Sequence, residues 1–102
     1  MVLHPEKELN LSDNIFSYKL VQKHPNPFNP GTTIVFQIPE LGFVSLKVFD
    51  VMGKEISTMV NEEKQAGSYK VGFDGSDSSS GIYIYQLLTG RVSMTEKMVL
   101  LK

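Results

Sequence analysis

The chain has 102 residues, of which 41% are hydrophobic, and this suits one globular domain with its own core. The formal net charge of −1 gives no electrostatic basis for binding nucleic acid or an anionic membrane, and no apolar run approaches the roughly 18 residues of a membrane span. The absence of cysteine excludes disulfides, thiolate metal sites and a cysteine nucleophile.

Residues 1–18 mix acidic and polar side chains with scattered apolar ones, without a clean helical or strand period. We interpret them as a leader or linker from a preceding domain, with a short strand expected around residues 15–21. The first eight residues lack the basic and apolar regions of a signal peptide. The folded domain is therefore predicted to occupy residues 19–102.

A proline-rich stretch follows the leader. Its three prolines remove three backbone donors and fix φ, and each pushes the residue before it out of the helical region. Asparagine side chains favour the turns that such a stretch must form. We predict a structural corner at the entry of a β-domain, made of Pro25, Asn26, Pro27, Phe28, Asn29 and Pro30.

Alternating apolar and polar residues dominate the rest of the chain, with Gly, Pro, Asn or Asp at nearly every turn. The apolar residues of the strand expected at residues 54–60 are unevenly spaced, which suggests a bulge or an early end of the strand. Residues 61–67 suggest a polar loop. No stretch of about 12 residues has a helical period. The pattern predicts an all-β fold, an antiparallel immunoglobulin-like β-sandwich of about seven strands. Its strands after the corner are expected within residues 34–38, 44–49, 54–60, 69–73, 82–88 and 92–101.

The residues that could support catalysis or bind metal are few. The only histidines are His4 and His24, and the serines of residues 76–80 lack the Gly-x-Ser-x-Gly spacing of a nucleophile elbow. Asp74 and Asp77 could hold Ca²⁺, but aspartates in turns need no metal. We predict that the protein is not an enzyme and has no catalytic residues, no metal site and no cofactor.

Aromatic residues alternate on two of the predicted strands. Tyr83 and Tyr85 share a face with Leu87, and Tyr69 lies on another strand. Such rings can form a platform for sugar stacking, but in a small sandwich they more often belong to the core. We favour the core.

Residues 97–102 place four consecutive apolar residues between Lys97 and Lys102. If this strand lies at a sheet edge, its free backbone can be read by a partner through strand pairing. If it pairs on both sides inside the sandwich, it is purely structural. The pattern does not decide between the two. An exposed final strand also predicts a homodimer through edge strands.

Several stretches, in this order, resemble the C-terminal sorting domain of the type IX secretion system. The resemblance covers about residues 20–102 and is carried by Pro25-Asn26-Pro27-Phe28-Asn29-Pro30-Gly31-Thr32-Thr33-Ile34, by residues 44–55, 66–69 and 73–75, by Ser80-Gly81-Ile82-Tyr83-Ile84-Tyr85-Gln86-Leu87, and by Lys97-Met98-Val99-Leu100-Leu101-Lys102.

The resemblance implies a non-catalytic secretion address on an immunoglobulin-like sandwich. Members belong to secreted or cell-surface proteins of the Bacteroidetes and neighbouring phyla. The domain is recognised in the periplasm and directs an upstream cargo domain across the outer membrane to the cell surface or the medium. In many members a sortase then removes the domain, and the cargo is either released or attached to a surface glycolipid. The implied partners are the translocon, the sortase components and the cargo.

The same resemblance implies where the signal lies and what surrounds the domain. The implied sorting-signal residues are Gly81, Tyr83, Lys97, Met98, Val99, Leu100, Leu101 and Lys102. A cleavage point is implied in the leader before residue 20. Because no cargo domain precedes the leader, we expect the chain to be the C-terminal module of a longer protein. The alternative function is an immunoglobulin-like accessory module of a secreted enzyme that binds carbohydrate or protein.

Overall fold

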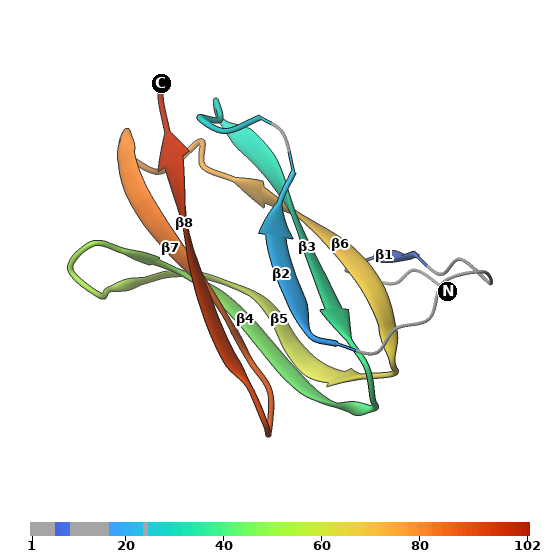
Figure 1. The fold of residues 1–102 in the computed structure, drawn as a ribbon. Coiled ribbons are helices and arrows are strands. Elements are labelled where there is room, and N and C mark those ends of the chain that lie inside the picture. The colour runs from blue at the N-terminus through green and yellow to red at the C-terminus, as the bar shows by residue number, and fades with distance from the viewer. Residues whose placement is uncertain (1–5, 9–16, 24) are drawn as a thin grey trace.

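The computed structural model describes residues 6–8, 17–23 and 25–102, which form strands joined by turns (Figure 1). Alternating side chains make these segments strands, because one face of each strand can be buried while the other stays in water. The strands of the described part are β1 (Glu6–Glu8), β2 (Lys19–Gln22), β3 (Gly31–Ile38), β4 (Gly42–Asp50), β5 (Glu55–Lys64), β6 (Gly67–Asp74), β7 (Gly81–Leu88) and β8 (Ser93–Leu100).

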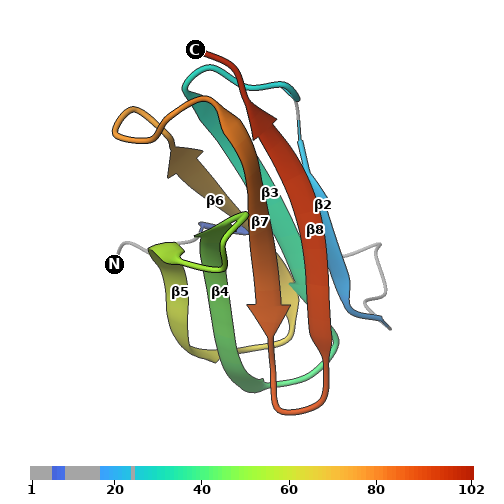
Figure 2. The same ribbon diagram turned by 90° about the vertical axis from the view of Figure 1, so that its left-hand side faces the viewer.

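The strands form two four-stranded sheets with the orders β1-β6-β3-β2 and β5-β4-β7-β8. All strand pairs are antiparallel, and Figures 1 and 2 show the two sheets lying face to face. The predicted antiparallel sandwich is confirmed. The strand expected at residues 82–88 is β7, which is central in its sheet because it lies between β4 and β8.

The core lies between the sheets and is filled by every second residue of the inner strands. On β4 these are Val44, Leu46 and Val48, all fully buried. Within the other sheet, the ring of Phe36 on β3 stacks on Tyr69, its direct partner on β6, with 5.1 Å between ring centroids. This stacking joins neighbouring strands of one sheet, and the close packing of the buried side chains holds the two sheets together.

β5 is longer than the sequence predicts. Residues 61–64 were predicted to be loop, but they continue β5, with Lys64 opposite Gly42. The strand lies at a sheet edge, so most side chains there stay in water and no alternating pattern is needed. The predicted bulge is confirmed by register shifts at Leu46/Lys47 and Val48/Phe49.

The start of the chain contributes two strands to one sheet. β2 pairs with β3 and overlaps the strand expected around residues 15–21 at residues 19–21 only. Residues 17 and 18 are not part of a strand, and residues 15 and 16 lie outside the described residues. β1 pairs with β6, with Glu6 opposite Lys70 and Glu8 opposite Ser68. Three residues of the predicted leader therefore extend the sheet of the domain.

Candidate functional site

The proline corner lies against the last strand (Figure 1). The Phe28 N–H donates to the Val99 carbonyl at 2.9 Å, and the Leu101 N–H donates to the Phe28 carbonyl at 3.0 Å. The Asn26 side-chain oxygen accepts from the Val99 N–H at 3.3 Å. The two motifs that lie farthest apart in the matched sequence therefore form one short parallel bridge, between Phe28 and Leu100.

Phe28 anchors the corner in the core. Its side chain is fully buried and meets Phe73 edge to face, with 5.9 Å between the ring centroids. The Gly75 N–H donates to the Pro30 carbonyl at 2.8 Å, and a Cβ on Gly75 would lie 3.0 Å from the Leu100 side chain. Proline fits such a corner because its missing N–H needs no partner. The Asn26–Pro27 and Asn29–Pro30 peptide bonds are cis.

The last strand lies at a sheet edge, which decides one of the alternatives left open by the sequence. Its residues alternate in exposure. Met98 and Leu100 are fully buried, whereas Val99 is half-buried and Lys97 and Leu101 are exposed. A partner that touches the folded domain can reach only the outward half of the predicted signal.

Lys102 closes the loop before β7. Its backbone N–H donates to the Ser80 hydroxyl at 2.8 Å, and its ammonium group donates to the Ser76 carbonyl. The Asp74 carboxylate accepts from the Ser76 N–H at 2.9 Å and from the Ser76 hydroxyl. These hydrogen bonds, with a smaller contribution from the nearby Lys102 charge, lower the pKa of Asp74. Asp74 thus acts as a turn-forming aspartate.

Tyr83 belongs to a repeated structural device. Its hydroxyl donates to the Ser79 carbonyl at 2.6 Å, and the Tyr69 hydroxyl donates in the same way to the Gln65 carbonyl at 2.6 Å. Each tyrosine lies two residues after the glycine that begins its strand, and Gly81, the first of β7, has φ 154°. The Gly-x-Tyr pattern therefore ties each strand to the loop before it. The recurrence of this spacing is a sequence signal that we missed.

Tyr83 and Tyr85 are both buried in the core, which confirms the preferred interpretation. Burial, assisted by the negative charge of Glu96, raises the pKa of Tyr85 to about 12. Neither ring can present its face to a sugar, so the carbohydrate platform considered for these two tyrosines is not formed.

The remaining sequence candidates lie in several places. His4 and His24 lie outside the described residues. Within the described ranges no three His, Asp or Glu residues gather in a way that could hold a metal ion. In this same part of the chain, no helix is long and apolar enough to cross a membrane.

Comparison with known proteins identifies the family. Residues 23–101 match the family described as "Secretion system C-terminal sorting domain". No curated protein matches the chain, and no solved structure does either. The matched range runs from the residues before the corner to the end of the last strand, and so contains both partners of the Phe28–Leu100 bridge. The chain belongs to the type IX secretion C-terminal sorting domain family.

Proposed function

We propose that this domain addresses an upstream cargo protein to the type IX translocon. The translocon reads the folded domain in the periplasm and passes the cargo across the outer membrane to the cell surface or the medium. The observation that carries the proposal is the family match over residues 23–101, which implies a secretion sorting signal. The domain does no chemistry itself. Sortase components then cut before residue 20 and release or anchor the cargo.

The geometry favours different roles for the two halves of the signal. Lys97, Val99 and Leu101 face outward and can be touched by a partner. Met98 and Leu100 support the fold, because their side chains are fully buried. A fully buried side chain contributes to recognition only by keeping the exposed ones in place.

The test is export of a reporter fused in front of the whole chain in a type IX-competent bacterium. Deletion of residues 98–102 is expected to abolish export. Because this deletion also removes the buried side chains of Met98 and Leu100, it changes folding as well as the signal. The double variant Val99→Ser with Leu101→Ser alters only half-buried and exposed positions, and should lower export while the domain stays folded.

Circular dichroism of the purified variants gives the folding control. Undiminished export of the deletion variant would refute the sorting function. If the deletion abolishes export and the double variant does not, export requires the fold but not the outward side chains of the last strand.

A further inference from the structure

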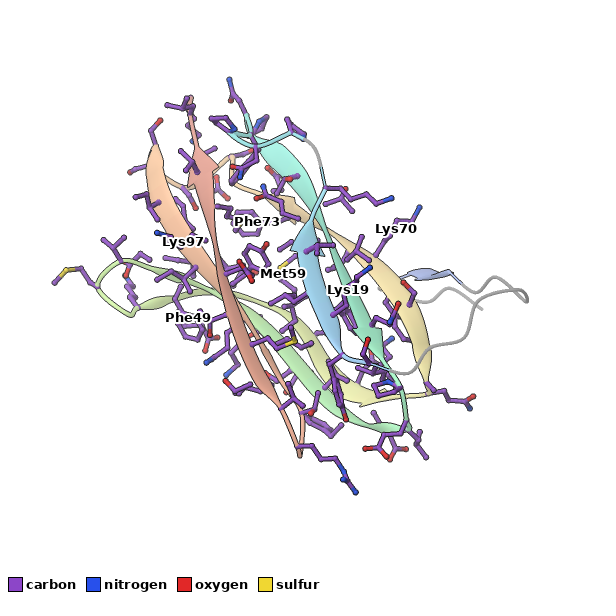
Figure 3. The ribbon with its side chains drawn as sticks, viewed as in Figure 1. Lys19, Phe49, Met59, Lys70, Phe73 and Lys97 are labelled. Atoms are coloured by element: carbon purple, nitrogen blue, oxygen red, sulfur yellow. The ribbon has the colours of Figure 1, made fainter. Side chains whose placement is uncertain are left out.

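The outer face of the β5-β4-β7-β8 sheet carries an apolar surface that no described element covers. Phe49 lies opposite Ile84, which lies opposite Lys97, and Ile82 lies opposite Val99 in the adjacent row. Figure 3 shows Phe49 and Lys97 on the side of this sheet that faces away from the core. We call this surface the hairpin face, and it consists of Phe49, Val51, Met52, Ile82, Ile84 and Val99.

The tip of the β4–β5 hairpin is the most exposed part of this face. Val51 is 64% exposed and Met52 is 87% exposed, although tight turns normally carry polar residues. The tip projects from this sheet on the side away from the core (Figure 1).

The hairpin tip has a fixed conformation. The Asp50 carboxylate accepts from the Met52 and Lys54 N–H groups, both at 2.9 Å, and Gly53 supplies φ 86°. The left-handed conformation at Gly53 is one that glycine adopts without strain. The apolar side chains at the tip are therefore held out in water rather than folded back onto the sheet.

The charges around the hairpin face are unbalanced. Lys47 pairs with Glu55 at 3.2 Å. Lys54 and Lys97 have no ion-pair partner among the described residues. The surface thus joins exposed apolar side chains to two lysines that form no ion pair among the described residues, and both kinds of side chain can contribute to a protein interface.

We propose that the hairpin face docks a folded protein of the export machinery whose contact surface is apolar and carries carboxylates opposite Lys97 and Lys54. The inference rests on the proposed sorting function and names the surface that the machinery contacts. A second copy of the chain is a poor occupant. In a two-fold dimer, Lys54 and Lys97 of one copy would need carboxylates from the same face of the other copy. The carboxylates of that face, Asp50 and Glu55, are already bonded to the turn backbone and to Lys47.

The test uses the reporter fusion of the whole chain with three variants of the hairpin face and of the two lysines beside it, which we call the hairpin-face variants. These are Val51→Ser combined with Met52→Ser, Lys97→Glu alone, and Lys54→Glu alone. The apolar control is Leu41→Ser with Phe43→Ser, which are 60% and 55% exposed at the other end of β4. The charge control is Lys19→Glu, an exposed lysine on β2 in the opposite sheet.

Each hairpin-face variant should lower export about tenfold or more, the loss expected for a contact residue at the centre of an interface, while both controls export normally. Unfolding midpoints in urea should be unchanged throughout, because every altered side chain is exposed. Export at the control level in the hairpin-face variants would overturn the inference.

The outcomes separate this inference from the proposed function. If deletion of residues 98–102 abolishes export and the hairpin-face variants do not, the inference fails and the sorting function stands. If neither change affects export, both fail. A dimer by sedimentation that dissolves in the Val51→Ser, Met52→Ser variant would show that a second copy occupies the face, and would also overturn the inference.

Discussion

Tyr83 and Tyr85 show how differently two inward-facing tyrosines of one strand can be used. The Tyr83 hydroxyl reaches the Ser79 carbonyl and fixes the loop before β7. The Tyr85 hydroxyl lies in a buried site near Glu96, where the charged phenolate is disfavoured. Alternation along β7 was enough to predict that both rings are in the core. The hydrogen bond of Tyr83 depends on the path of the preceding loop, which alternation does not describe.

Because of Tyr85, the protein should lose stability as the pH rises into the alkaline range. Its pKa is about 12 in the folded protein and 10.0 in its ordinary state, so the folded state favours the neutral phenol. The stabilisation is present below pH 10 and is lost as the pH rises toward 12, by roughly 2–3 kcal/mol. Urea unfolding across this range should show the loss, and Tyr85→Phe should reduce it.

The Tyr85→Phe variant should still lose some stability as the pH rises into the alkaline range, because burial also raises the pKa of Tyr69. An equal loss of unfolding free energy at alkaline pH in the unaltered protein and in the Tyr85→Phe variant would contradict the prediction. Absorbance of the phenolate provides an independent reading of the same titration.

Among the elements, the strands that alternate cleanly were predictable from the sequence, and those that do not were missed in part. β4 places Val44, Leu46 and Val48 on its inner face, and its period can be read directly. β5 continues through residues 61–64 because its backbone pairs with β4, not because its side chains alternate. Pairing with a neighbour can extend a strand that its own residues do not indicate.

The contact between the corner and β8 was beyond the reach of sequence patterns. Nothing local to Phe28 shows that its backbone will bond to Val99 and Leu101, because long-range register depends on how all the intervening strands pack. The sequence did show that residues 25–30 cannot be helix or central strand. A phenylalanine among prolines and asparagines was a signal that this corner also anchors in the core.

Gly75 lies where the proline corner meets the end of β8, and a substitution there tests how closely the two are packed. A methyl group there would lie 3.0 Å from the Leu100 side chain, 3.1 Å from the Pro30 carbonyl oxygen and 3.3 Å from the Phe28 ring. Gly75→Ala should therefore lower the free energy of unfolding by about 1–3 kcal/mol, as overpacking does. Urea unfolding measures the change.

The matched control is Gly72→Ala, because a methyl group at Gly72 meets no heavy atom of the described structure within 4 Å. This variant should change stability by less than about 1 kcal/mol. Equal stability of the two variants would show that the junction has room for the methyl group.

At the scale of the whole molecule, the exposed sheet edges determine how copies can associate. Residues 99–101 of the last strand are covered by the corner through hydrogen bonds to Phe28 and Asn26. Backbone N–H groups along a strand point alternately toward one neighbour and toward the other side. Because the Val99 N–H points away from β7 to Asn26, the Thr95 N–H also points away from β7, at the free edge of β8. The homodimer through edge strands therefore remains a prediction, and on β8 its pairing is limited to residues 93–97.

Light scattering at high concentration should detect this dimer. Thr95→Pro should dissolve it without unfolding the domain, because proline removes an outward N–H that an edge strand does not need. A single monomeric species of the unaltered protein at high concentration would refute the prediction.

The bridge between Phe28 and Leu100 also determines when the domain can fold during synthesis. A polypeptide interrupted before residue 98 lacks Met98 and Leu100, and leaves Phe28 without its backbone partners. Contacts between distant parts of a chain form only after both parts exist. The sandwich therefore closes only after the ribosome has passed through every preceding strand. Under the proposed sorting function, a folded domain therefore indicates that the cargo in front of it has been translated in full.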